Sequence, residues 1–256
     1  MDFREYEVMY RAEDRHWWYA GLRDILFRRT GLDQPRSRAW HILDAGCGTG
    51  GTLQALRHTG HLHAQGFDYS ADALYFCRQR GLRNVRKGSI MAIPFPDSAF
   101  DLLISNDVLC DTGTPNESCA LREMYRVLRP GGRVFLNLPA YTFMRSEHDR
   151  AVDVDRRYTM PQLRRMVRAV GFEIARMSHW NALLFPIVLA VRLRRKHGQE
   201  RAQADAQSDI RVPPAPLNQT LTRIIRVESR LMDWITIPYG SSIICLARRS
   251  APVRSN

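Results

Sequence analysis

The stretch HILDAGCGTGG, residues 41–51, constrains the fold of this chain more than any other segment. Three apolar or aromatic residues lead into Asp44, and four glycines follow within six positions. An apolar strand that ends in a glycine turn and opens a helix is typical of nucleotide-binding α/β folds, because glycine lets the backbone approach a ligand closely. We therefore predict that this loop binds a nucleoside cofactor.

The same letters satisfy two spacings. Gly46, Gly48 and Gly51 fit G-x-G-x-x-G, and Asp68 lies 20 residues beyond Gly48, as in a dinucleotide site. The second spacing, D-x-G-x-G-x-G, begins at Asp44. In both, a carboxylate at the end of the next strand can accept hydrogen bonds from a ribose. The loop alone leaves the choice of cofactor open.

Beyond residue 36, short apolar strands alternate with amphipathic helices, which indicates a parallel sheet wrapped by helices. A last apolar segment follows a long excursion, so we expect it to insert antiparallel. The predicted fold is a Rossmann-like α/β fold: a seven-stranded, mostly parallel sheet with an antiparallel last strand, helices on both faces and a helical insertion before that strand. We expect strands at 39–46, 63–68, 85–90, 99–106, 133–139, 172–180 and 238–249, and helices at 49–60, 70–81, 115–132 and 158–172.

We predict one domain over residues 1–256, made of an N-terminal helical lid (1–35), a cofactor-binding core (36–180), a helical or loop insertion (181–238) and the last strand with its tail (239–256). The N-terminus is charged and has no apolar stretch of a signal peptide. The longest apolar run, WNALLFPIVLAV, is shorter than the ~18–20 residues that a spanning helix needs.

Basic residues exceed acidic ones by 12, and all but two of the basic residues are arginine. This excess suits acidic partners, or it is a solvated basic surface. The arginines are spread along the chain, so we expect no specific nucleic-acid partner. The five cysteines include no C-x-x-C pair, so we expect neither a disulfide framework nor a metal site. A reducing cytoplasm fits them best.

Four motifs in order resemble the class I S-adenosylmethionine-dependent methyltransferases: DAGCGTG, GFDYS, KGSIMAIPFPDSAFDLLISNDVL and LRPGGRVFLNLP. The resemblance is to the branch of the LPFPDNSFDLV type and covers about residues 36–180. It implies S-adenosylmethionine as the cofactor and S-adenosylhomocysteine as its product. It also implies that the glycine register beginning at Asp44 is the functional one, and that Gly51 belongs to the helix start.

The resemblance assigns a cofactor site residue by residue. Asp68 would bind the ribose hydroxyls with Tyr69 beside the adenine, and Asn106 and Asp107 would lie near the methionyl group. Ser89 stands where the family commonly has aspartate, so its contact to the adenine amine would be weaker. The expected cofactor-binding residues of the core are Asp44, Ala45, Gly46, Cys47, Gly48, Thr49, Gly50, Asp68, Tyr69, Ser70, Ser89, Ile90, Asn106 and Asp107.

The segment HWWYAGLR resembles the HWWF-x-x-R start of a bacterial subgroup of the family. In one interpretation Trp17 and Trp18 form a lid whose aromatic faces contact the sulfonium, while Arg23 faces the cofactor carboxylate. In the other, the tryptophans anchor an amphipathic helix in the core. The sequence leaves both open.

The segment SEHDRAVDVDRRYT, after the fifth strand, resembles HDRAVGHDRRYT of the same subgroup, with Asp153 and Val154 in place of a Gly-His pair. If the reaction needs a general base, His148 is the first candidate, followed by Asp149 and Tyr158. A solvated loop with local ion pairs explains the same residues.

The expected function is methyl transfer by in-line displacement to an oxygen or nitrogen of a small acceptor, including a lipophilic or lipid-linked one. Residues 181–196 would contact a membrane surface or wall a pocket for such an acceptor, or would form a lid or dimer contact. The alternatives are an NAD-dependent oxidoreductase and a nucleic-acid-binding protein with a methyltransferase-like fold. We expect a monomer or a homodimer.

Overall fold

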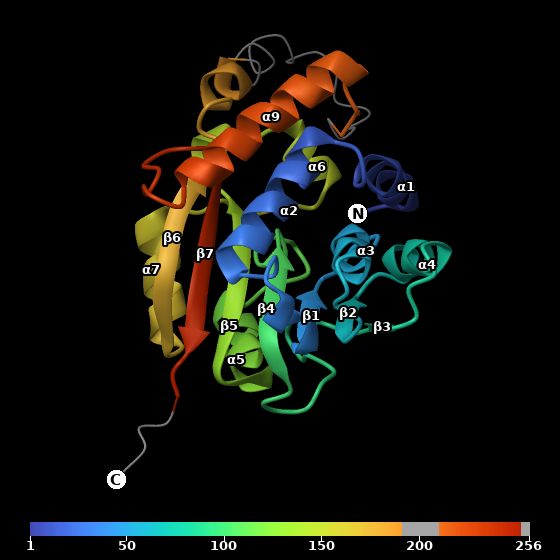
Figure 1. Ribbon diagram of the computed structural model, residues 1–256, viewed down its shortest axis with the longest axis vertical. Coiled ribbons are helices and arrows are strands. Elements are labelled where there is room, and N and C mark those ends of the chain that lie inside the picture. Colours follow the sequence, from blue (N-terminus) through green and yellow to red (C-terminus); the bar gives the residue numbers. More distant parts are fainter. Residues whose placement is uncertain (191–209, 252–256) are drawn as a thin grey trace.

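The computed structural model describes residues 1–190 and 210–251 (Figure 1). Its centre is a seven-stranded sheet in the order β3-β2-β1-β4-β5-β7-β6. The strands are β1 (Ile42–Ala45), β2 (Ala64–Asp68), β3 (Val85–Lys87), β4 (Phe100–Asn106), β5 (Leu128–Pro139), β6 (Phe172–Trp180) and β7 (Ser242–Arg249).

Neighbouring strands from β3 to β5 pair in parallel, while β7 runs antiparallel to both of its neighbours, β5 and β6. The predicted α/β fold with its antiparallel last strand is confirmed. The carboxyl ends of the six strands other than β7 share one edge of the sheet, and ligands bind at this edge in open α/β folds.

Helices cover both faces of the sheet (Figure 1). One core lies under α5 and α7, and the other lies under α2, α3, α4 and α9. Alternate strand residues feed the two cores: Leu43 enters the first and Ile42 the second. The helices are α1 (Phe3–Ala12), α2 (Trp17–Thr30), η1 (Pro35–Ala39), α3 (Gly51–His58), α4 (Ala71–Gln79), α5 (Glu117–Val127), η2 (Thr142–Met144), α6 (Glu147–Ala151), α7 (Met160–Ala169) and α9 (Ala215–Leu231).

The start of β5 differs from the prediction, which placed Pro130-Gly131-Gly132 at the end of a helix and began the strand at residue 133. The strand begins at Leu128, which pairs with Phe100, and the register then shifts before Arg133 pairs with Leu102. Pro130-Gly131-Gly132 lies within this irregular stretch.

The predicted N-terminal lid consists of two helices that lie against different parts of the molecule. Asp2 caps α1, which packs against α4, and the His16 imidazole caps α2, which packs along α9 (Figure 1). The insertion provides α9 and a helical stretch at 185–190, while residues 191–196 of the predicted lipid-contact segment lie outside the described residues. Over 1–190 and 210–251, no helix is long and apolar enough to cross a membrane.

Candidate cofactor and acceptor site

The glycine loop joins β1 to α3 at the carboxyl edge. Gly46, Gly48 and Gly50 have φ values of +75°, +53° and +88°, in the left-handed region that favours glycine. A Cβ atom at Gly46 would lie 2.4 Å from Cγ2 of Val108, so this position has no room for a side chain. The N–H groups of Gly46 and Cys47 donate to the Phe67 carbonyl at 2.9 Å, which fixes the loop against β2.

The conformation of the loop distinguishes its two registers. Gly50 is the N-cap of α3 and Gly51 is its first residue, so Gly51 belongs to the helix rather than to the turn. The Glu13 carboxylate accepts a hydrogen bond from the Gly51 N–H at 3.0 Å and another from the Thr49 hydroxyl. A dinucleotide would place its diphosphate at this helix N-terminus, which the chain already fills with a carboxylate of its own.

Glu13 belongs to a buried network that fastens the end of α1 to the loop. Arg80 lies 3.3 Å from Glu13 and 2.8 Å from Asp14, and its Nε donates to the Thr49 carbonyl at 2.8 Å. The Arg80 guanidinium also lies over the ring of Tyr10, 4.6 Å from its centroid. Burial raises the pKa of Glu13, and the contacts with Thr49 and Arg80 oppose that rise.

Two buried aspartates line the loop. Asp68, at the end of β2, accepts from the backbone N–H groups of Gly48 and Ser70, both at 2.9 Å, which leaves carboxylate lone pairs for a ligand. Asp44 is buried, and among the residues that the structure describes only burial and the charges of Glu13 and Asp68 shift its pKa, with no contribution from a hydrogen-bond donor. Burial, with Glu13 and Asp68 nearby, raises the pKa of Asp44 well above its ordinary range. Asp44 is therefore a buried carboxylate for which a ligand cation would be a partner.

The side chains of the loop itself point into the protein. Cys47 lies in the core with its sulfur 4.0 Å from that of Cys77, and Thr49 is fully buried against Glu13. A ligand would meet the backbone of these two residues. On the adenine side predicted from the sequence, Tyr69 is about half exposed, whereas Ile90 is buried in the core below.

Two predicted residues near that side act as local caps. Ser70 is the N-cap of α4, and its hydroxyl accepts from the Ala73 N–H at 3.4 Å. The Ser89 hydroxyl accepts from the Met91 N–H at 3.2 Å. The two hydroxyls hold the turns after β2 and β3.

At the end of β4, Asp107 adopts φ +56°, a conformation that side-chain-bearing residues seldom take. The Asn137 amide donates to the Asp107 carboxylate at 3.1 Å, and the Trp180 indole N–H donates to the Asn137 oxygen at 2.8 Å. Burial raises the pKa of Asp107 to about 7, against the lowering effects of Arg157 and Asn137. Asn137 of β5 and Trp180 of β6 thus hold the Asp107 carboxylate in a chain of two hydrogen bonds.

The neighbouring Asn106 has a buried Oδ1 atom without a hydrogen-bond partner in the described part of the chain. Within residues 1–190 and 210–251, the predicted methionyl side thus holds this acceptor and the Asp44 carboxylate, for which no donor is found. Both fit the ammonium of an amino acid.

Trp17 and Trp18 pack against the core shared by α2 and α9, as in the anchor interpretation. The Trp18 ring lies 5.4 Å from that of Trp180, and the Trp17 N–H donates to Asn218 of α9 at 3.0 Å. Arg23 donates to the Glu13 carbonyl at 2.8 Å, and it forms no ion pair within residues 1–190 and 210–251. It is α1 that reaches the loop, since a Cβ atom at Gly48 would lie 3.3 Å from the Met9 sulfur.

The predicted bases after β5 occupy structural positions. Asp149 is buried and pairs with Arg157 through two hydrogen bonds of 2.7 and 2.8 Å. Tyr158 is fully buried, and its hydroxyl donates to the Leu109 carbonyl at 2.8 Å. These contacts argue against general-base roles for both residues, because neither side chain is open to an acceptor. His148 lies in α6, and its side chain is outside what the structure describes.

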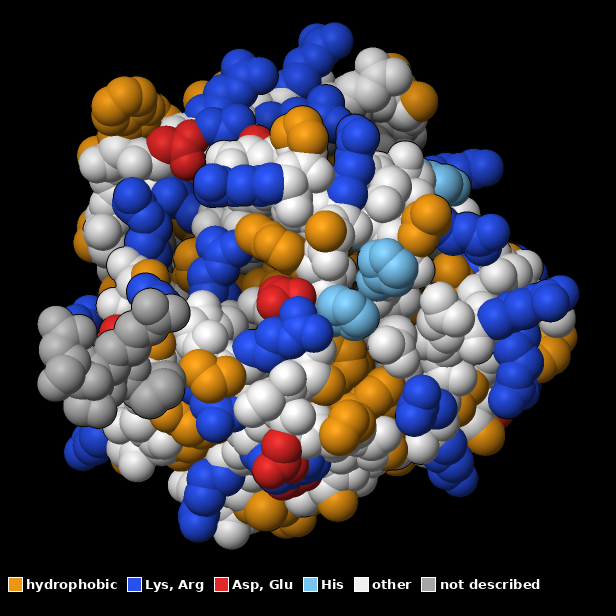
Figure 2. Space-filling view, turned by 60° about the horizontal axis from the view of Figure 1, so that its bottom comes forward, with side chains coloured by type: hydrophobic (Ala, Val, Ile, Leu, Met, Phe, Trp, Pro, Cys, Tyr) orange, Lys and Arg blue, Asp and Glu red, His pale blue; other side chains and the backbone are white. Residues whose placement is uncertain are grey.

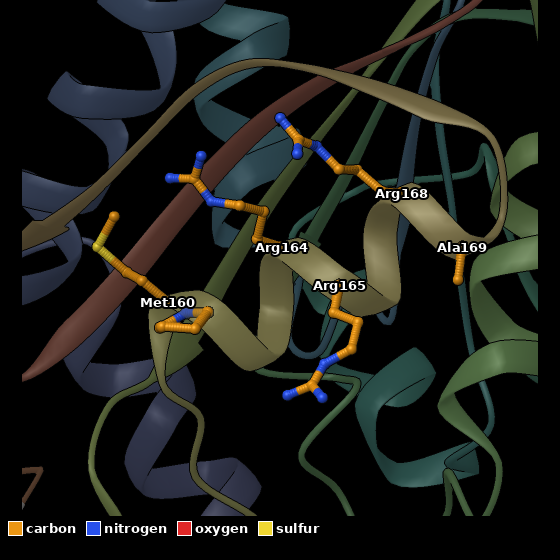
Figure 3. A pocket seen from close by; sticks show the side chains of 6 residues that line it. Met160, Arg164, Arg165, Arg168 and Ala169 are labelled. Atoms are coloured by element: carbon orange, nitrogen blue, oxygen red, sulfur yellow. The ribbon is translucent and has the colours of Figure 1, made fainter.

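Away from this edge, α7 borders a hollow of about 870 Å³ (Figure 3). Arg164, Arg165 and Arg168 extend from the helix around it. Its lining within the described residues includes neither a carboxylate nor a histidine, so it differs in chemistry from the site at the sheet edge. Figure 2 shows basic side chains scattered over another face rather than gathered in one stripe, in keeping with the dispersed arginines of the sequence.

Residues 43–136 match the family model of the methyltransferase domain. This segment contains the glycine loop and the strands β2, β3 and β4. It is a class I S-adenosylmethionine-dependent methyltransferase domain. S-adenosylmethionine is the cofactor of this family, and the recognition made from the four motifs is confirmed.

Curated relatives match only part of the chain. A malonyl-[acyl-carrier protein] O-methyltransferase of Erwinia billingiae is 34% identical over 128 residues, 50% of this chain and 50% of that protein. A demethylmenaquinone methyltransferase of Lactiplantibacillus plantarum is 35% identical over 103 residues, 37% and 43% of the two chains. The chain thus spans about half the length of the relatives it matches.

The solved structure of the [4+2]-cyclase SpnF is similar to 91% of this chain and 82% of its own, with a TM-score of 0.58 and 24% identity. That likeness extends the shared fold beyond the methyltransferase domain. Because one neighbour of the fold is named as a cyclase, the fold by itself does not define the reaction.

Proposed function

We propose that this chain transfers a methyl group from S-adenosylmethionine to an oxygen or nitrogen atom of a small lipophilic or lipid-linked molecule. The observation that carries the proposal is the Glu13 carboxylate at the N-terminus of α3. It leaves a nucleoside site with no place for a diphosphate, which suits a sulfonium nucleoside and excludes NAD.

The residues present fit the cofactor. The backbone of Gly46 to Gly50 would lie along it, Asp68 would accept the ribose hydroxyls, and Asp44 and the Asn106 oxygen would accept its ammonium. When bound, S-adenosylmethionine supplies an electrophilic methyl group. The chain's own contribution is alignment and exclusion of water, which account for much of the acceleration of an in-line displacement.

Asp107 is our candidate for the general base, in place of Asp149 and Tyr158. It lies at the end of β4, next to the residues expected at the methionyl group, and its pKa of about 7 suits proton removal near neutral pH. Asp149 then has two opposing effects on the pKa of Asp107: its own charge raises that pKa, and it holds Arg157, whose charge lowers it. An acceptor hydroxyl or protonated amine would give its proton to Asp107 as the methyl group arrives.

The acceptor is a further part of the proposal. The relatives' names state a malonyl-[acyl-carrier protein] acceptor in one case and demethylmenaquinone in the other, so relatives of this domain differ in acceptor. A lipophilic acceptor is supported by exposed apolar residues on the insertion and the segment after α9, among them Leu183, Ile187 and Trp234. We also propose peripheral contact of this surface with lipid.

Calorimetry with S-adenosylhomocysteine and with NAD tests the cofactor. We expect binding of S-adenosylhomocysteine alone, and binding of NAD alone would refute the proposal. A labelled methyl donor mixed with lipid and aqueous cell extracts then tests the acceptor class, with label expected in the lipid extract. Co-sedimentation with anionic vesicles at low salt tests the membrane contact, and a chain that stays in the supernatant would count against it.

A further inference from the structure

His179 is a buried histidine with unused hydrogen-bonding capacity. It lies near the carboxyl end of β6, is 4% exposed, and neither ring nitrogen has a hydrogen-bond partner among the described residues. Burial lowers the pKa of His179, and the backbone of Ile237 opposes that lowering. A neutral imidazole offers one donor and one acceptor. Because buried polar groups without partners destabilise a fold, such a ring indicates that a partner is missing.

A column of parallel aromatic rings leads from His179 to the surface. The Tyr141 ring stacks on the imidazole with centroids 5.3 Å apart and an interplanar angle of 15°. Phe143 also stacks on the Tyr141 ring, with centroids 5.2 Å apart, and is exposed to solvent. Tyr141 adopts φ +58°, and non-glycine residues in such conformations are found preferentially at ligand sites.

The insertion and the segment before β7 complete the wall. Phe185 meets the Tyr141 ring edge-on at 6.1 Å, and Tyr239, half exposed, lies 6.0 Å from Phe185. Asn181, two residues after His179, is also buried and has an Oδ1 atom without a partner in the part of the chain described. An apolar aromatic wall with a few unpaired polar groups is the usual composition of a small-molecule site.

The position of His179 in the sheet relates it to the site of methyl transfer. Leu138 of β5 pairs with Ile243 of β7, which pairs with His179, so the histidine lies in register with the end of β5. Three strand steps separate β4 from β6, which is about 14 Å at the usual strand spacing. His179 is therefore too far from Asp107 to touch the reacting atom, but it could hold the other end of an extended acceptor.

We propose that His179, Tyr141 and Phe185 bind the part of the acceptor that is not methylated, and that this part is a flat aromatic ring carrying a hydroxyl or carbonyl oxygen. The ring packs against Tyr141 and Phe185, and its oxygen pairs with His179. Access requires a side-chain rotation of Phe185 or Tyr141, because the imidazole nitrogens are covered. That the ligand is the methyl acceptor rests on the proposed function. Binding of an aromatic ring at His179 does not depend on methyl transfer.

The probe for the test is 2-naphthol, with naphthalene as the matched ligand without a hydroxyl. Nitrogen-15 spectra of histidine-labelled protein report the imidazole nitrogens, and the His179→Phe variant identifies which of the eight histidines gives the His179 signals. We expect 2-naphthol to shift the His179 signals and to bind about tenfold more tightly than naphthalene, in line with one buried hydrogen bond. Equal affinity of the two probes, or unmoved His179 signals, would overturn the inference.

Two variants separate ligand binding from structure. His179→Phe keeps a ring of similar shape and removes the two unpaired nitrogens, so we expect a higher Tm without ligand and no preference for 2-naphthol. His179→Gln keeps a donor and an acceptor and should retain part of the preference. A lower Tm for His179→Phe would mean that the nitrogens have partners in the protein, which contradicts the premise. S-adenosylhomocysteine binding measured on the same samples shows separately whether the proposed function fails.

Discussion

The two halves of the ligand edge satisfy their buried polar groups in different ways. Around the glycine loop, Asp68 and Glu13 accept hydrogen bonds from backbone and side-chain donors of the chain itself. On the side of β6, His179 and Asn181 keep buried polar atoms without partners in the described residues. The contacts of the chain itself thus preorganise the glycine loop, whereas the side of β6, the proposed acceptor half, retains hydrogen-bonding capacity for a ligand.

The exceptions in the cofactor half support the same distinction. Asp44 and the Asn106 oxygen have no donor in the described part of the chain, and both lie where the resemblance places the methionyl group. Under the proposed function, buried groups without partners among the described residues would contact a ligand in both halves. The two halves differ in that, in the cofactor half, these groups lie beside the glycine loop, whose backbone has a fixed left-handed conformation at Gly46, Gly48 and Gly50.

Replacement of Gly46 should reduce cofactor binding more than any other change considered. In Gly46→Ala the new Cβ atom would lie 2.4 Å from Val108 at a φ of +75°, so the loop must change shape. We expect S-adenosylhomocysteine affinity to fall at least ~100-fold by calorimetry, since misplacement of a cradle costs several contacts together.

Gly81→Ala is the matched control for that variant. Gly81 has a similar φ of +71°, but a Cβ atom there meets nothing within 4 Å. It should lose about 1 kcal/mol of stability and keep its affinity. Equal loss of affinity in both variants would show that backbone strain, rather than the cradle, causes the effect.

Asp107→Asn should reduce methyl transfer about 100-fold if Asp107 is the base. The rate of the unmodified chain should rise with pH through about 7 as the carboxyl ionises, and the variant's profile should be flat. A variant that retains the pH-dependent rise would remove Asp107 from the mechanism.

The raised pKa of Asp107 also predicts how the stability of the fold changes with pH, and this can be measured without an acceptor. Its pKa in the folded chain, about 7, is above its ordinary value of 3.8, so its contribution to stability is complete below 3.8 and is lost as the pH rises through about 7. In Asp107→Asn the side chain does not ionise, so this pH-dependent loss of stability is absent. Thermal unfolding should therefore show the variant gaining Tm relative to the unmodified chain across that window, and a constant difference would contradict the raised pKa.

The sequence predicts the strand, glycine loop and helix of the cofactor half because the signals for these elements are local. The glycine loop and Asp68 belong to short motifs whose conformation depends on a few neighbouring residues, and the alternation of strands and helices predicts the order of elements. Glu13 and Asn137 are missed because their partners lie far along the chain, 38 residues away for Gly51 and 43 for Trp180. No spacing in the sequence reports such contacts, which depend on how the helices and strands pack.

The acceptor half is harder to predict for a related reason. Charged residues clustered after β5 suggested bases, but Asp149 forms a buried ion pair and Tyr158 enters the core. A cluster of ionisable residues looks the same in the sequence whether it serves packing or chemistry. His179, within an ordinary strand pattern, gave no signal because only its missing partners set it apart.

Glu13→Gln tests the network that holds α1 to the loop. The amide can still accept from the Gly51 N–H, but Arg80 loses the charge of Glu13. Of its two ionic partners among the described residues, it then keeps the half-exposed Asp14. We expect a loss of about 2 kcal/mol in urea unfolding, below the range for a buried charge left without any partner. Glu7→Gln, which breaks an exposed pair with Arg11, should cost no more than about 0.5 kcal/mol. Equal costs would mean that burial of the network adds nothing.

The smallest expected effect comes from Trp180→Phe, and it measures how far the two halves are coupled. Without the indole donor, the Asn137 amide can rotate and turn its oxygen toward Asp107, which would raise the pKa of Asp107 further. The rate at pH 7 should fall about threefold, as for the loss of one neutral hydrogen bond, and the midpoint of the pH profile should move upward. Trp40→Phe makes the same change at a half-buried position that packs on Arg133, away from the chain of hydrogen bonds, and should leave the midpoint in place. An unmoved midpoint in Trp180→Phe would show that Asp107 is positioned by its own backbone conformation, and that β6 contributes to the acceptor side alone.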